Sequence, residues 1–346
     1  MNKQHQLLQI AAITPVSLWV SCFRLIRADG AKPAAFFAGQ YLNLFYSIDG
    51  ARTCRPYSIA SSPKEALESG WYEVYIHGGG SFTSAWLFRN AFVGMQIESS
   101  MPEGEFCLDP AGGLKRVIGI SGGMSITPLR AMARAVADGT LDLDLTLFCG
   151  WDSREDVLFY EEFRQLADAC PRFRAVYFLK DGGAAGFEPG YVDLERIQRY
   201  ADCRDAAFYL CGPGEMYQAL ERSLKPLHIP ADRYHIELPG EVKAGFPGTG
   251  PVLQGETFHL TAHLWGETHQ ISMRSDETVL VALERAGINA EPRCRSGHCG
   301  YCGARKLRGR VFVPDRWSRV RPDGEPEDLI HPCCSFPLSD LEILVE

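Results

Sequence analysis

Three cysteines within nine residues are the strongest chemical signal in this chain of 346 residues. They lie in the stretch CRSGHCGYC, at positions 294, 299 and 302, and two more follow at 333 and 334. Thiolates are strong ligands for soft metal ions, and glycines between them let the backbone wrap closely around a bound group. The stretch therefore predicts a metal centre held by Cys294, Cys299, Cys302 and one later cysteine.

The spacing of these cysteines discriminates between kinds of metal centre. Four residues separate the first two and two residues separate the next pair, which is the plant-type ferredoxin pattern for a [2Fe–2S] cluster. A zinc site normally has two C-x2-C pairs, and here there is one. A Rieske centre needs two histidine ligands, whereas His298 and His331 stand beside cysteines. We therefore expect a [2Fe–2S] cluster.

The fourth ligand has two candidates in HPCCSFPLSD, namely Cys333 and Cys334. The segment resembles the end of ferredoxin-like domains, where a ligand cysteine is followed by a variable residue, a small residue, an aromatic residue and proline. In that frame Cys333 falls on the ligand position and Cys334 on the variable one. The resemblance implies Cys333 as the ligand, with Cys334 as the alternative.

The segments before the cysteines predict a small domain around the cluster. TFHLTAHLWGETHQISM alternates as a hairpin with its turn at residues 265–267. DETVLVALERAG predicts a helix that Asp276 caps and Gly287 ends. A Gly- and Pro-rich linker at 240–254 precedes them. We expect a [2Fe–2S] ferredoxin domain of β-grasp fold over residues 255–346.

A flavin is the usual adaptor between a two-electron nicotinamide and a one-electron cluster. RPYS, with Arg55, Tyr57 and Ser58, matches the R-x-Y-S signature of ferredoxin-NADP reductase-like flavoproteins. An arginine pairs with a flavin phosphate, an aromatic ring covers the isoalloxazine, and a hydroxyl reaches the flavin N5. A Gly-Ser/Thr loop follows in HGGGSFTSAWL and opens a short helix that suits phosphate; its candidates are Gly80, Thr83 and Ser84.

Residues 112–239 predict a nucleotide-binding α/β domain, because strand and helix patterns alternate as in a doubly wound sheet. GGMSITP resembles the G-G-x-G-x-T-P turn of the same flavoproteins, with Ser125 in place of the third glycine. CGPGEM resembles their C-G-P-x-x-M, which lies under the nicotinamide. The matching residues are Gly122, Gly123, Thr127, Pro128, Cys211, Gly212, Pro213 and Met216.

These motifs occur in one order along nearly the whole chain. The chain thus resembles three-domain NAD(P)H-dependent iron–sulfur flavoprotein reductases, such as reductase components of bacterial oxygenases and the NADH reductase of the hybrid-cluster protein. The resemblance implies a flavin-binding antiparallel β-barrel over residues 1–111, before the nucleotide and ferredoxin domains. It implies hydride transfer to the flavin near Ser58 and Cys211, and places Glu237 where relatives have an acidic residue near the flavin.

The cofactors implied are FAD, with FMN as the alternative, and NADH, with NADPH as the alternative. Ser153 and Arg154 are of types that bind a 2′-phosphate, which keeps NADPH open. A second function is a self-contained flavin enzyme that reduces a small molecule, with the cluster as relay. A third, a binding protein with a vestigial nucleotide site, is suggested only by Ser125.

Charge and hydropathy bear on partners and location. The net charge of −8 argues against general nucleic-acid binding. No apolar run has the length of a membrane span and no signal-peptide pattern opens the chain, so we expect a cytoplasmic protein without a membrane anchor. The stretch from 293 to 320 has one acidic residue, Asp315, and eight basic ones. This basic collar predicts an acidic redox partner, an oxygenase or other metalloenzyme, that docks near the cluster. Its basic residues are Arg293, Arg295, Arg305, Lys306, Arg308, Arg310, Arg316 and Arg319.

Overall fold

The structure of the chain is a computed structural model, which describes residues 5–48, 51–79, 82–182, 185–237, 255–264, 266–288, 290, 292, 295, 297, 300–314 and 326–345. The chain forms two compact units. The N-terminal unit consists of Met1–Leu42 and Tyr57–Pro239, and the C-terminal unit of Asn43–Pro56 and Gly240–Glu346. The predicted linker at 240–254 lies outside the described residues.

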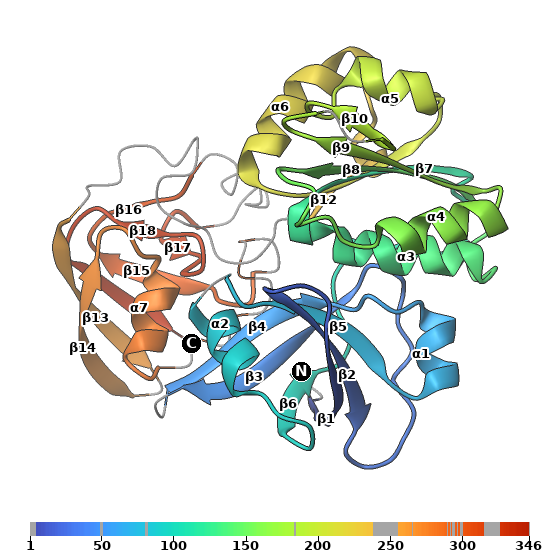
Figure 1. Ribbon diagram of the computed structural model, residues 1–346. Helices are drawn as coiled ribbons and strands as arrows, with labels where there is room; N and C mark the ends of the chain where they lie inside the picture. The colour runs from blue at the N-terminus through green and yellow to red at the C-terminus, as the bar shows by residue number, and fades with distance from the viewer. Residues whose placement is uncertain are drawn as a thin grey trace. The chain divides into compact units, whose positions relative to one another are not determined.

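An antiparallel sheet with strand order β4-β3-β6-β1-β2-β5 is drawn in blue to cyan in Figure 1. Side chains alternate between its faces, so Leu8 and Ile10 of β1 are fully buried while Leu7 is exposed. A register shift between β1 and β2 at Ile10 and Ala12 increases the local twist. This curled sheet confirms the predicted barrel. Its strands are β1 (His5–Pro15), β2 (Val20–Arg27), β3 (Tyr41–Ile48), β4 (Ala51–Ser58), β5 (Tyr72–His77) and β6 (Gln96–Ser100).

Two helices accompany this sheet. The first, α1 (Pro63–Ser69), begins with a capping box in which Ser62 and Glu65 exchange side-chain and backbone hydrogen bonds, and ends at Gly70 in the left-handed conformation. The second, α2 (Phe82–Asn90), follows the glycine-rich stretch after β5. A Cβ atom on Gly78 would lie 2.5 Å from the ring of Phe88, so glycine is what lets this stretch approach α2.

A parallel sheet forms the nucleotide half of the N-terminal unit, with order β10-β9-β8-β7-β11-β12. The chain proceeds outward from β7 to β10 on one side, then returns to place β11 and β12 on the other. This reversal makes the space beyond the carboxyl ends of β7 and β11 a topological switch point, where ligands of such sheets bind. The strands are β7 (Arg116–Gly122), β8 (Asp144–Trp151), β9 (Phe173–Leu179), β10 (Phe187–Pro189), β11 (Ala207–Cys211) and β12 (Tyr234–Glu237).

Helices cover both faces of the parallel sheet. Figure 1 shows α3 and α4 on one face and α5 and α6 on the other. Leu129, Met132 and Ala133 of α3 are fully buried in the core beneath the sheet. The observed layers confirm the predicted doubly wound α/β fold. The helices are α3 (Thr127–Ala137), α4 (Tyr160–Ala169), α5 (Leu194–Tyr200) and α6 (Gly214–Leu224).

The C-terminal unit contains a mixed sheet with order β14-β13-β19-β15-β17. Strands β13 and β14 form the predicted hairpin, with Leu264 opposite Glu267 and Gly266 at a positive φ of 88°; Trp265 lies outside the described residues. The final strand pairs parallel with β13 and antiparallel with β15. The elements are β13 (Thr257–Leu264), β14 (Glu267–Arg274), α7 (Val279–Arg285), β15 (Ala304–Arg308), β16 (Val311–Phe312), β17 (Leu329–Ile330), β18 (Phe336–Pro337) and β19 (Leu341–Val345).

The cap of α7 differs from the prediction. Thr278, not Asp276, is the N-cap residue, and its hydroxyl accepts a hydrogen bond from the backbone of Val281. Asp276 instead pairs with Arg274 at 3.2 Å. Both residue types favour an N-cap position, and here Thr278 occupies it while Asp276 forms the ion pair. The predicted end at Gly287 is close, since the helix ends at Arg285 and Gly287 has a positive φ of 76°.

Candidate functional site

Two loops meet at the switch point of the parallel sheet. Cys211 at the end of β11 is in register with Ser121 near the end of β7. A Cβ atom on Gly122 would lie 2.6 Å from Pro213, and one on Gly212 would lie 2.2 Å from Met216. The absence of side chains at both glycines therefore allows the GGMSITP and CGPGEM segments to pack together.

The turn after β7 leads directly into a helix. Gly123 has a positive φ of 58°, which favours glycine. Thr127 and Pro128 then form the first turn of α3, where proline is tolerated because its missing N–H would have no partner within the helix. The N-terminus of α3 thus presents backbone N–H groups at the carboxyl edge of the sheet, where a phosphate is favoured.

The thiol of Cys211 is buried and neutral. Its side chain is 3% exposed, and burial raises its pKa well above the usual range, with the negative charge of Glu237 adding to this effect. Ser125 forms a hydrogen bond with the thiol, which opposes the rise. Ser125 therefore contacts Cys211, the first residue of the C-G-P motif. Glu237 is the residue of β12 that pairs with Cys211 across the sheet.

The residues predicted to bind a flavin lie on β4 and α2. The hydroxyl of Tyr57 is 3.0 Å from that of Ser84, so the R-x-Y-S strand and the first turn of α2 are hydrogen-bonded. Arg55 and Thr83 are buried, at 6% and 8% exposure. Ser58 ends β4 and is half-buried. Gly80 lies outside the described residues.

A buried arginine joins the flavin motif's sheet to the nucleotide half within the N-terminal unit. Arg130 of α3 donates to the carbonyl of Ala60 at 2.9 Å and to the carboxylate of Glu73 at 3.1 Å. Its guanidinium also lies over the ring of Tyr75 and pairs with Glu162 at 3.0 Å. Ala60 is two residues beyond Ser58, so this network positions α3 and its N-terminus against the segment that follows the R-x-Y-S motif.

Sequence reasoning missed Arg130. The available signal was a charged residue within the apolar pattern of TPLRAMARAVA. Arginine is almost never fully buried unless it is paired. The pattern alone does not show which carboxylates lie opposite, because Glu73 and Glu162 belong to other elements.

In the C-terminal unit, two of the four predicted metal ligands are described, and they lie together. The backbone N–H of Gly297 donates to the Sγ of Cys333 at 3.2 Å. A hydrogen bond with Cys333 lowers the pKa of the Cys302 thiol to about 6, against the opposing effect of burial. Cys334 has a different partner, because its Sγ is directed to the carbonyl of His331 at 3.5 Å. Cys294 and Cys299 lie outside the described residues.

Part of the basic collar is exposed near these thiols. Within the described part of the collar, Arg308 and Arg310 are exposed and make no ion pair, whereas Arg305 pairs with Asp328 at 3.2 Å. Arg295 does not belong to the exposed surface, because its side chain is 1% exposed and pairs with Glu284. Arg293, Arg316 and Arg319 lie outside the described residues.

Comparison with known proteins gives two domain matches. Residues 120–222 match the family described as oxidoreductase NAD-binding domain. Residues 262–338 match the 2Fe-2S iron-sulfur cluster binding domain. The first range contains the switch point, and the second contains all the cysteines predicted to bind iron.

Relatives match the chain over nearly its full length. It is 27% identical over 332 residues to the glycine betaine monooxygenase reductase subunit of Chromohalobacter salexigens, covering 90% of this chain and 88% of the relative. It is 29% identical over 310 residues to the ferredoxin reductase component of 3-ketosteroid-9-alpha-monooxygenase from Mycobacterium tuberculosis, covering 87% and 83%. The solved structure of phthalate dioxygenase reductase superimposes with a TM-score of 0.71 at 22% identity, covering 99% and 98%.

The domain matches, the full-length relatives and the shared three-part fold agree. The chain thus combines an oxidoreductase NAD-binding domain with a 2Fe-2S cluster binding domain, and over nearly its full length it is similar to reductase components of oxygenases. The two domain matches confirm the predicted oxidoreductase with a nicotinamide nucleotide and a [2Fe–2S] cluster.

The described residues of this reductase fit these groups. Gly122 and Gly212 have no side chains, so the two loops pack closely and no side chain at these positions covers the carboxyl edge of the sheet. The start of α2, hydrogen-bonded to Tyr57, offers N–H and hydroxyl donors to a flavin phosphate. A backbone N–H that donates to Cys333 Sγ is the contact that cluster-ligating thiolates accept.

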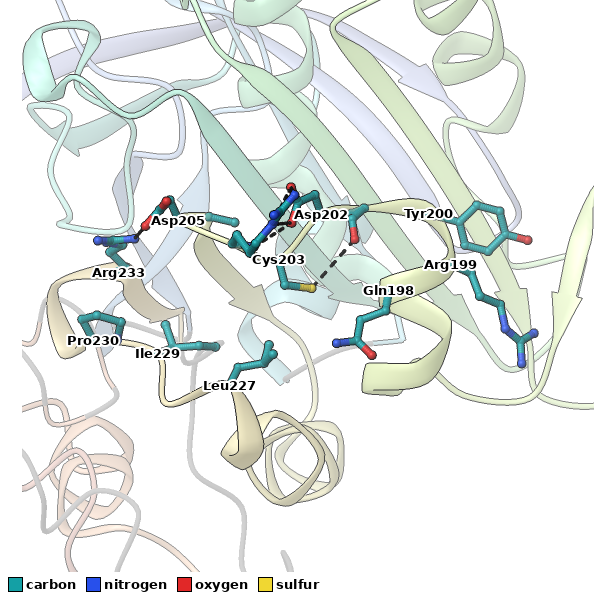
Figure 2. Close-up of a pocket in the computed structure, with 13 residues that line it drawn as sticks. Gln198, Arg199, Tyr200, Asp202, Cys203, Asp205, Leu227, Ile229, Pro230 and Arg233 are labelled. Carbon is teal, nitrogen blue, oxygen red and sulfur yellow. Dashed lines mark hydrogen bonds and ion pairs between the residues drawn. The ribbon is translucent and has the colours of Figure 1, made fainter.

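The reductase also has a hollow of about 800 Å³, shown in Figure 2. It lies beside the amino end of β11, opposite the edge that holds the switch point. Charged groups of its lining have protein partners, as Arg233 does in Asp205 at 3.1 Å and Arg204 does in Asp202 at 2.9 Å. We therefore assign the chemistry to the carboxyl edge and not to this hollow. No described helix of the reductase is long and apolar enough to cross a membrane.

Proposed function

We propose that this reductase is the electron-transfer component of an oxygenase system. The observation that carries the proposal is that one chain contains the flavin motif, the nucleotide edge and the cluster thiols, and that it matches reductase components of oxygenases over nearly its full length. When bound, the flavin accepts hydride from the nicotinamide and releases electrons singly to the cluster, which passes them on to the partner. We propose domain limits at residues 111 and 239, with the ferredoxin domain starting at 255.

Three residues of β4 would hold the flavin. Arg55 would pair with its phosphate, Tyr57 would cover the ring, and Ser58 would reach N5. The hydrogen bond between Tyr57 and Ser84 supports this assignment, because it sets the orientation of the ring relative to the start of α2. Gly80, Thr83 and Ser84 would bind phosphate there.

The switch-point loops would hold the nicotinamide nucleotide. The start of α3 would receive the pyrophosphate through Gly122, Gly123, Thr127 and Pro128. The C-G-P segment would lie under the nicotinamide through Cys211, Gly212, Pro213 and Met216. The buried, neutral thiol is small and polarizable, so it can lie against the nicotinamide without blocking hydride transfer.

Electrostatics at the end of β8 favours NADH as the donor. Ser153 donates to the carboxylate of Asp156 at 2.7 Å, and the guanidinium of Arg154 lies over the ring of Phe187. Both groups that suit a 2′-phosphate thus have protein partners. The stretch also carries Asp152, whose charge would repel a 2′-phosphate but accept a bond from a ribose hydroxyl.

The iron ligands would be Cys294, Cys299, Cys302 and Cys333. The contacts of Cys333 with Gly297 and Cys302 support its choice over Cys334, whose thiol has the carbonyl of His331 as its partner. We propose a cytoplasmic location, where reducing conditions keep these thiols available for iron.

The partner would be an acidic protein that docks beside the cluster. Arg308 and Arg310 are exposed, and the same segment also exposes two apolar side chains, Tyr301 at 44% and Leu307 at 50%. Unpaired exposed charges attract an oppositely charged surface, and aromatic side chains are enriched where proteins dock.

Anaerobic titration with NADH and then NADPH, followed by visible absorption and low-temperature EPR, tests the function. We expect flavin bleaching together with a one-electron cluster signal, at lower concentrations of NADH than of NADPH. Bleaching without the cluster signal would mean that the electrons stop at the flavin. Turnover of a small molecule with no added protein would favour the self-contained enzyme.

Charge reversal tests the docking surface. Replacing Arg308 and Arg310 by glutamate is expected to slow reduction of the partner oxygenase and to weaken its dependence on ionic strength. Arg305→Glu is the control, because Arg305 is already paired with Asp328. Unchanged partner kinetics in the double variant, with the salt dependence intact, would refute this surface.

A further inference from the structure

Arg295 forms a buried ion pair with α7 and a hydrogen bond with the strand that carries the flavin motif. Arg295 directly follows the predicted ligand Cys294. Its guanidinium donates to both carboxylate oxygens of Glu284 in α7, at 2.6 and 2.7 Å. The same group donates to the backbone carbonyl of Cys54 in β4 at 3.2 Å. All three residues belong to the C-terminal unit.

Two more contacts join the same elements. The hydroxyl of Thr53 lies 3.4 Å from the Glu284 carboxylate. The thiol of Cys54 is directed to the carbonyl of Pro292 at 3.3 Å and is 2% exposed. Residues 53 and 54 immediately precede the R-x-Y-S motif on the same strand, Ala51–Ser58. The contacts therefore connect a neighbour of the flavin motif to neighbours of a cluster ligand.

The backbone conformation of Arg295 is consistent with a residue held by its contacts. Its φ is 57°, in the left-handed region that a non-glycine residue seldom occupies. Such a conformation persists when surrounding contacts determine it. A bidentate pair with Glu284 and a third bond to Cys54 supply those contacts. A lysine cannot donate these two parallel hydrogen bonds, because its ammonium group lacks the planar geometry of a guanidinium.

We propose that Arg295 and Glu284 form a clamp that positions the cluster loop against β4 and thereby sets the rate of electron transfer from flavin to cluster. The two are positioning residues. When bound, the cluster would take up one electron at a time from the flavin by reduction of one ferric ion to ferrous and would be reoxidised by the partner. The clamp would hold the residue next to its ligand Cys294 against β4. This inference rests on the proposed function for its kinetic part only.

The test uses the holoprotein and two clamp variants. Glu284→Leu combined with Arg295→Met removes both charges together, which proteins tolerate better than the loss of one partner. Arg295→Lys keeps the positive charge but cannot form the bidentate pair with Glu284. It replaces the double variant in the test if the double variant does not retain iron. Arg305→Met, which breaks an exposed pair with Asp328, is the control.

Alkylation of Cys54, followed by peptide mass spectrometry, measures the clamp without any turnover. We expect labelling in both clamp variants to be faster by at least about tenfold, because charge-assisted bonds that oppose local opening are lost. Equal labelling of Cys54 in wild type and clamp variants would overturn the proposal, whatever the nucleotide does.

Anaerobic stopped-flow measurement after mixing with NADH supplies the second readout. Flavin bleaching should keep its wild-type rate, whereas cluster reduction should slow by at least about tenfold in variants with wild-type iron content. Cluster reduction at the wild-type rate would refute the clamp's role. Failure of the wild type itself to bleach would refute the proposed function instead, and Cys54 labelling would still decide the clamp.

Discussion

Arg130 provides a prediction whose size follows from the structure. The side chains of Arg130 and Glu73 are 5% and 6% exposed and lie 3.1 Å apart. Replacement by methionine keeps much of the volume but leaves the Glu73 carboxylate buried, with Arg24 at 3.1 Å as its remaining cation among the ion pairs of the described residues. Removing one partner of a buried pair costs about 3–5 kcal/mol. We therefore expect Arg130→Met to lower the free energy of unfolding by about that amount.

Urea denaturation of the holoprotein, followed by circular dichroism and flavin fluorescence, measures the effect. Arg164→Met is the matched control, since Arg164 forms ion pairs in which both partners are more than half exposed; its variant should unfold close to the wild-type midpoint. A loss below about 1 kcal/mol in Arg130→Met would refute the reasoning, because the buried carboxylate would then have found another partner.

The stability difference between wild type and Arg130→Met should depend on pH in a definite direction. Burial raises the pKa of Glu73, but Arg130 and Arg24 outweigh burial, so its pKa in the folded protein is lowered. Its contribution to stability is therefore present above the unfolded pKa of about 4.3 and is lost as pH falls through the folded pKa. In Arg130→Met this acid loss should be smaller, so the difference from wild type should shrink below about pH 4.

Four further substitutions test individual site residues. Cys333→Ser should lose most bound iron, whereas Cys334→Ser should keep it, as measured by iron content and EPR; equal loss in both would contradict the choice of Cys333. Gly212→Val should weaken NADH binding by at least about tenfold, because its Cβ would lie 2.2 Å from Met216; an unchanged dissociation constant in a fluorescence titration would be the contrary result. Cys211→Ala should slow flavin reduction with no new pH dependence between pH 6 and about 9, since burial keeps the thiol neutral; a titrating rate present only in the wild type would show a thiolate instead.

Much of this reductase was predictable from residues that are neighbours in the chain. The cysteine spacing, the R-x-Y-S strand and the glycine turn before α3 each depend on local geometry. A cluster ligand loop needs closely spaced thiols with glycines between them, and a phosphate-binding turn needs glycine before a helix. Such requirements appear directly in CRSGHCGYC and GGMSITP.

The local evidence was weaker where two neighbouring residues could serve equally well. Asp276 and Thr278 both suit a helix cap, and here Thr278 caps the helix while Asp276 pairs with Arg274. Cys333 and Cys334 are both buried thiols. Their different partners depend on how Gly297 and His331 are brought to them.

The sequence by itself thus determined that a nucleotide-binding domain precedes a 2Fe-2S domain, and it predicts a local site for each cofactor. Only the tertiary structure decided which distant groups meet: Cys211 with Ser121 across the switch point, Arg130 with Glu73, and Arg295 with Glu284 and Cys54. The physical reason is that motif geometry depends on bonds between neighbours. The partner of a buried charge instead depends on how whole elements pack, and no local pattern records that.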